Sequence, residues 1–231
     1  MNVEQARYYM IEQQLRPWLV LDPKLLECIQ AVRRELFVPA AYQAMAFADM
    51  EIPLRANPTQ GEHMLSPKLE GRLLQALSIQ PDDRALQIGT GSGYMAAVMA
   101  QMGANVLSLE LEVELGQMAR KSLQKANITE VEVRVTDGSG GAPKEGPYDI
   151  ILLTGSVAFV PQTFFNQLKP GGRLVAVVGD APAMTAMLYT RKEESTDTEK
   201  PVSMEDIHAQ SLFETYIERL RNFDENPSFT F

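Results

Sequence analysis

The sequence predicts an α/β fold with a mostly parallel, doubly wound sheet, a helical N-terminal region and a C-terminal antiparallel hairpin. Two observations support this prediction. From residue 85 onward, short apolar runs alternate with helix-like stretches, which is typical of a parallel sheet covered by helices on both faces. A glycine-rich turn separates the first apolar run from the helix that follows it, as in folds that bind a ligand at the strand ends.

The first 80 residues are predicted to be mainly helical. One helix can run over residues 3–15 and ends before Pro17. A second helix is predicted over residues 23–36, because its apolar residues follow helical spacing and a proline suits its first position. Residues 52–66 contain two prolines and a glycine and predict a long irregular loop of a kind that often carries function. Pro67 is expected to open the next helix.

The remainder of the chain supplies the predicted sheet. A pair of strands over 184–192 and 208–216 is expected to form the antiparallel hairpin, and the polar segment between them, 193–205, is predicted to be a solvated loop. We expect one domain over 1–231, with 1–80 as the helical N-terminal region and substrate-side loop and 81–231 as the ligand-binding core. The other predicted strands are 85–88, 106–109, 131–135, 149–153 and 173–178, and the predicted helices between them are 94–101 and 115–125.

Composition narrows the class of protein. Of the 231 residues, 45% are hydrophobic and 22% are charged, which is ordinary for a globular domain. The net charge of −9 disfavours a broad nucleic-acid-binding surface. The single cysteine, Cys28, excludes an internal disulfide framework and is predicted to be a buried structural thiol. The N-terminal residues show neither a secretory signal nor a membrane span, so we expect a cytoplasmic protein with no membrane partner.

The strongest motif is the segment ALQIGTGSGYMAA. Gly89, Gly91 and Gly93 stand at alternate positions between a predicted strand and a predicted helix. Glycine allows the backbone to turn sharply and lets a ligand approach closely. The helix N-terminus adds unpaired N–H groups and a partial positive charge. This end of the helix would face the pyrophosphate of a dinucleotide, or the methionine carboxylate and ribose of S-adenosylmethionine (SAM).

Two further elements follow at successive strand ends. Glu110 lies 21 residues after Gly89, and a carboxylate at that place can accept hydrogen bonds from both ribose hydroxyls. Asp137 and Gly138 follow the next strand, where they can border the adenine. Three such elements are stronger evidence than a glycine turn alone, although the segment 91–96 also satisfies a relaxed dinucleotide pattern. A nicotinamide-dependent oxidoreductase therefore stays open as an alternative.

With these motifs, the sequence resembles the protein-L-isoaspartate O-methyltransferase family. The resemblance is carried by ALQIGTGSGYMAAVMA, VLSLE, VTDGSGGAP with PYDIILLTGS, GGRLVAVVG, and the N-terminal segments ELFVP, AD and PL. It implies a Rossmann-like class I SAM-dependent methyltransferase fold, SAM as cofactor, and methyl transfer to a carboxylate of a protein or peptide, as in protein repair. The implied cofactor-binding residues are Gly89, Thr90, Gly91, Ser92, Gly93, Glu110, Leu111, Asp137, Gly138 and Thr154.

The chain departs from the family pattern at two places. The family has a Gly-Gln-Thr-Ile-Ser segment before a helix that begins with proline. When Gly61 and Pro67 are aligned with it, Leu65 takes the position of the family serine and Ser66 lies one place later. The strand that ends in Thr-Ala-Ala in the family ends here in residues 154–156, Thr-Gly-Ser.

The candidate catalytic residues are therefore Ser66 and His63. A carboxylate acceptor is ionised at neutral pH and needs no general base. An amine or hydroxyl acceptor more often needs one, and His63, in the loop expected to cross the site, is the best candidate. The sequence predicts a SAM-dependent O-methyltransferase with a protein or peptide acceptor and no metal. The alternatives are a non-catalytic SAM-binding interaction protein, favoured by Leu65, and the oxidoreductase.

Overall fold

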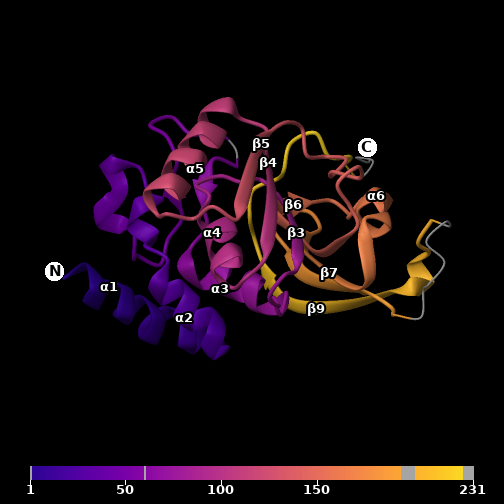
Figure 1. Cartoon of the computed structure of the whole chain (residues 1–231), viewed down its shortest axis with the longest axis horizontal. Helices are drawn as coiled ribbons and strands as arrows, with labels where there is room; N and C mark the ends of the chain where they lie inside the picture. Colours follow the sequence, from indigo (N-terminus) through magenta and orange to yellow (C-terminus); the bar gives the residue numbers. More distant parts are fainter. Residues whose placement is uncertain (1, 60, 194–200, 226–231) are drawn as a thin grey trace.

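The computed structural model describes residues 2–59, 61–193 and 201–225. Its centre is a seven-stranded sheet in the order β5-β4-β3-β6-β7-β8-β9 (Figure 1). The first five strands in this order run parallel, and β8 and β9 extend the sheet as an antiparallel hairpin. This is the fold class that the sequence predicts. The strands are β3 (Arg84–Ile88), β4 (Asn105–Glu110), β5 (Val131–Val135), β6 (Tyr148–Val157), β7 (Leu168–Val178), β8 (Met184–Arg191) and β9 (Ile207–Thr215).

Both faces of the sheet are covered. In β6, Ile150 and Leu152 belong to one buried apolar cluster, whereas Ile151 and Leu153 belong to the other, as the two-residue period of a strand requires. The first cluster also holds the N-terminal helices, and the second includes the apolar side of the short helix α6. The helices are α1 (Val3–Met10), α2 (Pro23–Ala31), α3 (Pro67–Ala76), α4 (Tyr94–Gln101), α5 (Val113–Lys125) and α6 (Gln162–Asn166).

The N-terminal region departs from the predicted elements in three respects. The first helix continues beyond α1 as a π-helical turn, Ile11–Leu15, and a 3-10 turn, Arg16–Trp18. The second helix ends at Ala31, because Val32 is extended with ψ of 116°, and only a 3-10 turn, Arg34–Leu36, follows. This early end lets the Arg34 side chain enter the interior, where it is fully buried. Another 3-10 turn spans Ala40–Met45.

The predicted loop over 52–66 contains a small antiparallel hairpin. Strands β1 (Ile52–Pro53) and β2 (His63–Met64) pair Ile52 with Met64 and Pro53 with His63. Both Ile52 and Met64 are buried, so the loop is anchored to the apolar interior at its base. The prediction of an irregular loop is therefore wrong at its two ends, where burial of alternate apolar residues favours pairing.

The C-terminal hairpin is confirmed, and a further segment follows it. The 3-10 turn Met204–Asp206 leads into β9. The part of the predicted loop from 194 to 200 lies outside the described residues. Residues 216–223, which we call the C-terminal strap, then cross the edge of the sheet where the parallel strands end, and Ser156 forms a bridge with Arg219. Among the described helices, none has the length and apolar character needed to cross a membrane.

Candidate functional site

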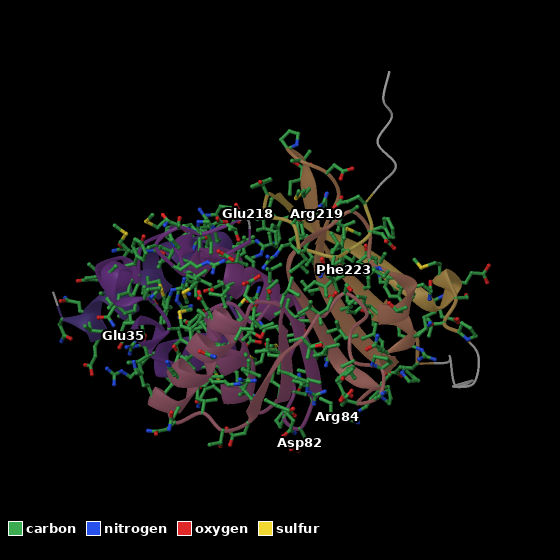
Figure 2. The ribbon with its side chains drawn as sticks, turned by 90° about the horizontal axis from the view of Figure 1, so that it is seen from above. Glu35, Asp82, Arg84, Glu218, Arg219 and Phe223 are labelled. Atoms are coloured by element: carbon green, nitrogen blue, oxygen red, sulfur yellow. The ribbon has the colours of Figure 1, made fainter. Side chains whose placement is uncertain are left out.

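One pocket lies where the strap, the β1–β2 hairpin and the carboxyl ends of β3, β4 and β6 meet. Figure 2 shows Glu218, Arg219 and Phe223 of the strap near the middle of the molecule, where the N-terminal region adjoins the sheet. We distinguish two sides of the pocket. The sheet side is lined by strand-end residues, which include Gln87, Ile88, Gly89, Thr90, Gly91, Ser92, Leu109, Glu110, Leu111, Asp137, Gly138 and Thr154. The hairpin side is lined by Glu51, Gly61, Glu62, His63, Met64 and Leu65.

The glycine turn forms the floor of the sheet side. Gly89, Gly91 and Gly93 have φ angles of +88°, +54° and +86°, which L-residues rarely adopt. A Cβ at Gly89 would lie 2.5 Å from Oγ1 of Thr154, whose hydroxyl donates to the Ile88 carbonyl at 2.8 Å. Thr154 thus fixes the end of β3 against β6. Gly93 precedes α4 and lies outside the pocket lining, whereas the other residues of the turn line it.

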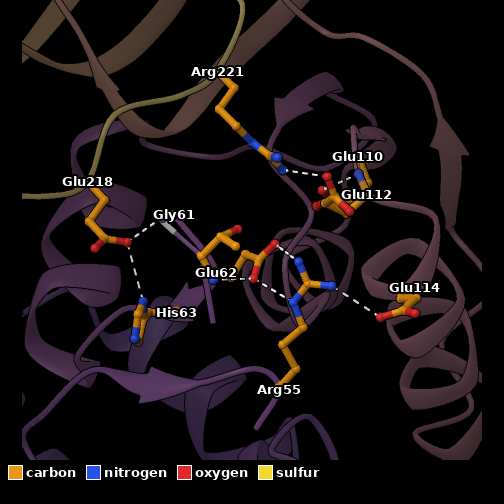
Figure 3. Close-up of polar contacts among 10 residues, drawn as sticks. Arg55, Gly61, Glu62, His63, Glu110, Glu112, Glu114, Glu218 and Arg221 are labelled. Atoms are coloured by element: carbon orange, nitrogen blue, oxygen red, sulfur yellow. Dashed lines mark hydrogen bonds and ion pairs between the residues drawn. The ribbon is translucent and has the colours of Figure 1, made fainter. Parts of the chain in front are cut away.

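Glu110 ends β4, and its side chain is almost fully buried beside this turn. Figure 3 shows Glu110 next to Glu112. Its two carboxylate oxygens accept hydrogen bonds from the N–H groups of Gly91, at 2.8 Å, and Glu112, at 3.0 Å. Burial nevertheless raises the pKa of Glu110, against the effect of these hydrogen bonds. Each carboxylate oxygen keeps a second lone pair, so the group can also accept hydrogen bonds from a ligand.

Asp137 and Gly138 form the far rim of the sheet side. Partial burial opposes ionisation of Asp137, but hydrogen bonds from Ser139 and Asn222 lower its pKa. A Cβ at Gly138 would lie 2.9 Å from Cγ2 of Ile88, so the close approach of this turn to β3 requires glycine. The sheet side therefore offers a buried carboxylate, a glycine turn and a second carboxylate at three successive strand ends. These groups fit a nucleoside ligand that carries ribose hydroxyls and an amino group.

The hairpin side contains two acidic residues with opposite behaviour. Glu62 is buried, and burial alone would raise its pKa, but Arg55 and the N–H of Thr59 lower that pKa to about 2. Burial raises the pKa of Glu51, which has His63 and Glu218 as neighbours. Glu62 is thus fixed as a carboxylate inside its ion pair with Arg55, and Glu51 adds an acidic group beside His63.

Arg34 lies beneath the hairpin side and fixes its backbone. The guanidinium donates to the carbonyl of Ala46 and to that of Leu65, each at 2.8 Å, and forms a buried ion pair with Glu70 of α3. It also stacks over the ring of Tyr94 at 4.7 Å. Because Leu65 is held by its carbonyl, its side chain is placed at the pocket wall.

The structure separates the two expected catalytic residues. His63 lines the pocket, and its Nδ1 lies 3.3 Å from a carboxylate oxygen of Glu218. Ser66 immediately precedes α3, where its carbonyl accepts from the N–H groups of Leu69 and Glu70 at 3.1 Å, and it lies outside the pocket lining.

The strap contributes residues that the sequence does not single out. Its main chain pairs with Ser156, whose N–H donates to the Glu218 carbonyl and whose carbonyl accepts from Leu220, both at 2.9 Å. Arg221 forms an ion pair with Glu112 at 2.8 Å (Figure 3). The sequence hints at the strap only through Gly155, where the family has a larger residue. A Cβ at this position would lie 2.8 Å from Cγ of Leu220. The small residue at this departure from the family pattern makes room for the strap.

Comparison with known proteins gives consistent matches. The family model described as protein-L-isoaspartate(D-aspartate) O-methyltransferase matches residues 5–207. Curated relatives with the name protein-L-isoaspartate O-methyltransferase include one from Methanoculleus marisnigri, 35% identical over 83% of this chain and 86% of the relative. Another is protein-L-isoaspartate O-methyltransferase 1 from Syntrophobacter fumaroxidans, which is 38% identical over 81% of this chain and 86% of the relative.

Solved structures support the fold. A structure named protein-L-isoaspartate O-methyltransferase superposes with a TM-score of 0.76 at 24% identity, over 93% of this chain and 64% of that one. A Plasmodium falciparum structure assigned to the same family, in complex with S-adenosyl-L-homocysteine, gives a TM-score of 0.71 at 18% identity. That match covers 91% of this chain and 96% of the other.

Proposed function

The chain belongs to the protein-L-isoaspartate O-methyltransferase family, and on that premise we propose that it methylates the free carboxylate of L-isoaspartyl residues in peptides or proteins. It is a SAM-dependent O-methyltransferase, and SAM is its cofactor. Neither the non-catalytic alternative nor the oxidoreductase is favoured by this membership. The observation that carries the proposal is the continuous pocket, because its two sides offer separate places for a nucleoside cofactor and an acceptor.

The cofactor is assigned to the sheet side. Glu110 would accept hydrogen bonds from the ribose hydroxyls through the lone pairs that are not used by the N–H groups of Gly91 and Glu112. The glycine turn would hold the amino-acid end near the start of α4, and Asp137 with Gly138 would border the adenine. When bound, SAM supplies a methyl group on a positively charged sulfur.

The acceptor is assigned to the hairpin side. A carboxylate attacks a methyl group without prior loss of a proton, so the chain needs to orient the acceptor and not to activate it. We propose His63 as a hydrogen-bond donor to that carboxylate, because His63 lines the pocket. Ser66 has a different role in this account, since its carbonyl supports the start of α3.

The test is methyl transfer from methyl-labelled SAM to an isoaspartyl peptide, with the normal aspartyl peptide as control. Label is expected in the isoaspartyl peptide alone. Calorimetry that shows SAM binding without transfer to either peptide would contradict the proposal.

A pair of histidine variants tests the acceptor side. His63→Ala is expected to raise the KM for the peptide about tenfold, because one hydrogen bond to a charged group is lost. His208→Ala is the matched control, since His208 is exposed on β9 and lies outside the pocket lining. Equal KM values for the two variants would remove His63 from the proposal.

A further inference from the structure

The strap places a carboxylate of the chain itself on the hairpin side of the pocket. One oxygen of Glu218 accepts a hydrogen bond from the N–H of Gly61 and lies 3.3 Å from Nδ1 of His63 (Figure 3). The Glu218 side chain is 28% exposed and that of His63 is 24% exposed, so the contact is largely shielded from solvent. The family model ends at residue 207, so the strap lies beyond the matched part of the chain.

The charged groups around Glu218 do not compensate the charge of a second carboxylate. Both arginines that line the pocket are already paired, Arg219 with Asp180 at 2.7 Å and Arg221 with Glu112 at 2.8 Å. Glu51 adds an acidic group on the same side. An acceptor carboxylate that used the donors on Gly61 and His63 would therefore meet like charge from Glu218.

We propose that Glu218 occupies the subsite of the acceptor carboxylate, with the Gly61 N–H and the His63 ring as its donors, and that the strap is thereby an internal competitor of the peptide. This inference rests on the proposed carboxyl methylation. A peptide binds only while Glu218 is withdrawn, so its apparent affinity is reduced by the fraction of molecules in which the subsite is open.

The strap is held independently of the Glu218 side chain. Its main chain pairs with Ser156 on both sides of Arg219, and the Ser156 hydroxyl donates to the Ile217 carbonyl at 3.0 Å. Leu220 packs over Gly155. Substitution of Glu218 thus removes the competing carboxylate while the strap keeps its other contacts.

The first experiment compares steady-state kinetics of Glu218→Ala with the full unmodified chain, using methyl-labelled SAM and an isoaspartyl peptide. The KM for the peptide is expected to fall about tenfold, with kcat changed by less than about twofold, because one charge-assisted contact no longer competes. Glu214→Ala is the matched control, since Glu214 is exposed at the end of β9, and its KM is expected to stay unchanged. An unchanged KM in Glu218→Ala would overturn the inference.

A second variant tests the inference if Glu218→Ala does not fold. Glu218→Gln keeps the size of the side chain and one acceptor oxygen but removes the charge, so a smaller decrease in KM is expected. A KM for Glu218→Gln that matches the unmodified chain, together with normal folding, would show that the charge does not compete.

Binding without turnover separates this inference from the proposed function. The isoaspartyl peptide and its carboxamide analogue are titrated into each variant by calorimetry in the presence of S-adenosylhomocysteine. Tighter binding of the carboxylate peptide alone to Glu218→Ala supports the inference, even if no variant transfers methyl. If Glu218→Ala binds both peptides more tightly by the same factor, the side chain acts only through its bulk, and the inference of a competing carboxylate fails. If the variant methylates the peptide but binds it no more tightly than the unmodified chain does, the proposed reaction holds and the inference fails.

Discussion

The two sides of the pocket are built in different ways. On the sheet side, Glu110 ends β4 and Asp137 lies just beyond β5. Their backbone partners belong to the glycine turn after β3 and to the residues that follow each strand, and Asn222 of the strap adds one contact to Asp137. On the hairpin side, Leu65 is fixed by Arg34 and Gly61 by Glu218, so residues from distant parts of the chain come together. The sheet topology places the main groups of the sheet side, whereas the hairpin side depends on particular long-range contacts.

This difference teaches where the chain can vary. The carboxyl ends of neighbouring parallel strands always meet at one edge of the sheet, so a ligand site there follows from the fold. The hairpin side has no such constraint. Both departures from the family pattern, Leu65 and Gly155, lie on or beside the hairpin side and the strap.

The largest expected effect comes from the buried pair under the hairpin. Arg34→Ala leaves Glu70 buried without its partner and is expected to reduce the free energy of unfolding by about 3–5 kcal/mol. Urea denaturation measures the change. The matched control is Arg33→Ala, because Arg33 is largely exposed next in sequence, and its effect is expected within about 0.5 kcal/mol. Similar losses for both variants would mean that the hairpin side does not depend on Arg34.

The next largest effect is expected for cofactor binding on the sheet side. Glu110→Ala is expected to weaken SAM binding about 10- to 150-fold, because hydrogen bonds to a charged group contribute about 1.5–3 kcal/mol. Calorimetry measures the dissociation constant. Glu114→Ala is the control, since the Glu114 side chain is 77% exposed and lies outside the pocket lining. SAM binding that survives Glu110→Ala would break the assignment of the cofactor to this side.

A smaller effect is expected where the strap crosses β6. Gly155→Ala places a Cβ 2.8 Å from Leu220, which is expected to cost about 1–2 kcal/mol of stability by overpacking. The KM for the peptide should fall at the same time, because the strap is displaced. Gly140→Ala is the control, since nothing lies within 4 Å of a Cβ at that position. The same result for both glycines would contradict the packing argument.

The smallest expected effect is a pH dependence on the sheet side. Burial raises the pKa of Glu110 above the ordinary value of 4.5. The protonated carboxyl accepts hydrogen bonds less well than the carboxylate does. The affinity for SAM should therefore be highest above this raised pKa and should decrease as the pH falls through it. A calorimetric pH series measures the decline. With Glu110→Gln the decline should vanish, and a decline that persists in that variant would assign it to another group.

The same contrast explains what the sequence could predict. The order of strands and helices, the glycine turn and the positions of Glu110 and Asp137 follow from local patterns, and the structure places these residues at one pocket. The end of α2 at Ala31 and the β1–β2 pairing depend on tertiary burial of Arg34, Ile52 and Met64, which no local pattern encodes. Glu218 is not predictable, because it lies beyond the predicted strand 208–216 in a segment without a pattern, and its partners Gly61 and His63 are far away in the sequence.

The most direct test of the central claim is the chemical nature of the transferred methyl group. After incubation of the protein with methyl-labelled SAM and the isoaspartyl peptide, the labelled peptide is isolated and treated with mild base. A carboxyl methyl ester hydrolyses under these conditions, so the account predicts that nearly all of the label leaves as methanol. Label that stays on the peptide would show transfer to a nitrogen or an ether oxygen and would contradict the assignment of this pocket to carboxyl methylation.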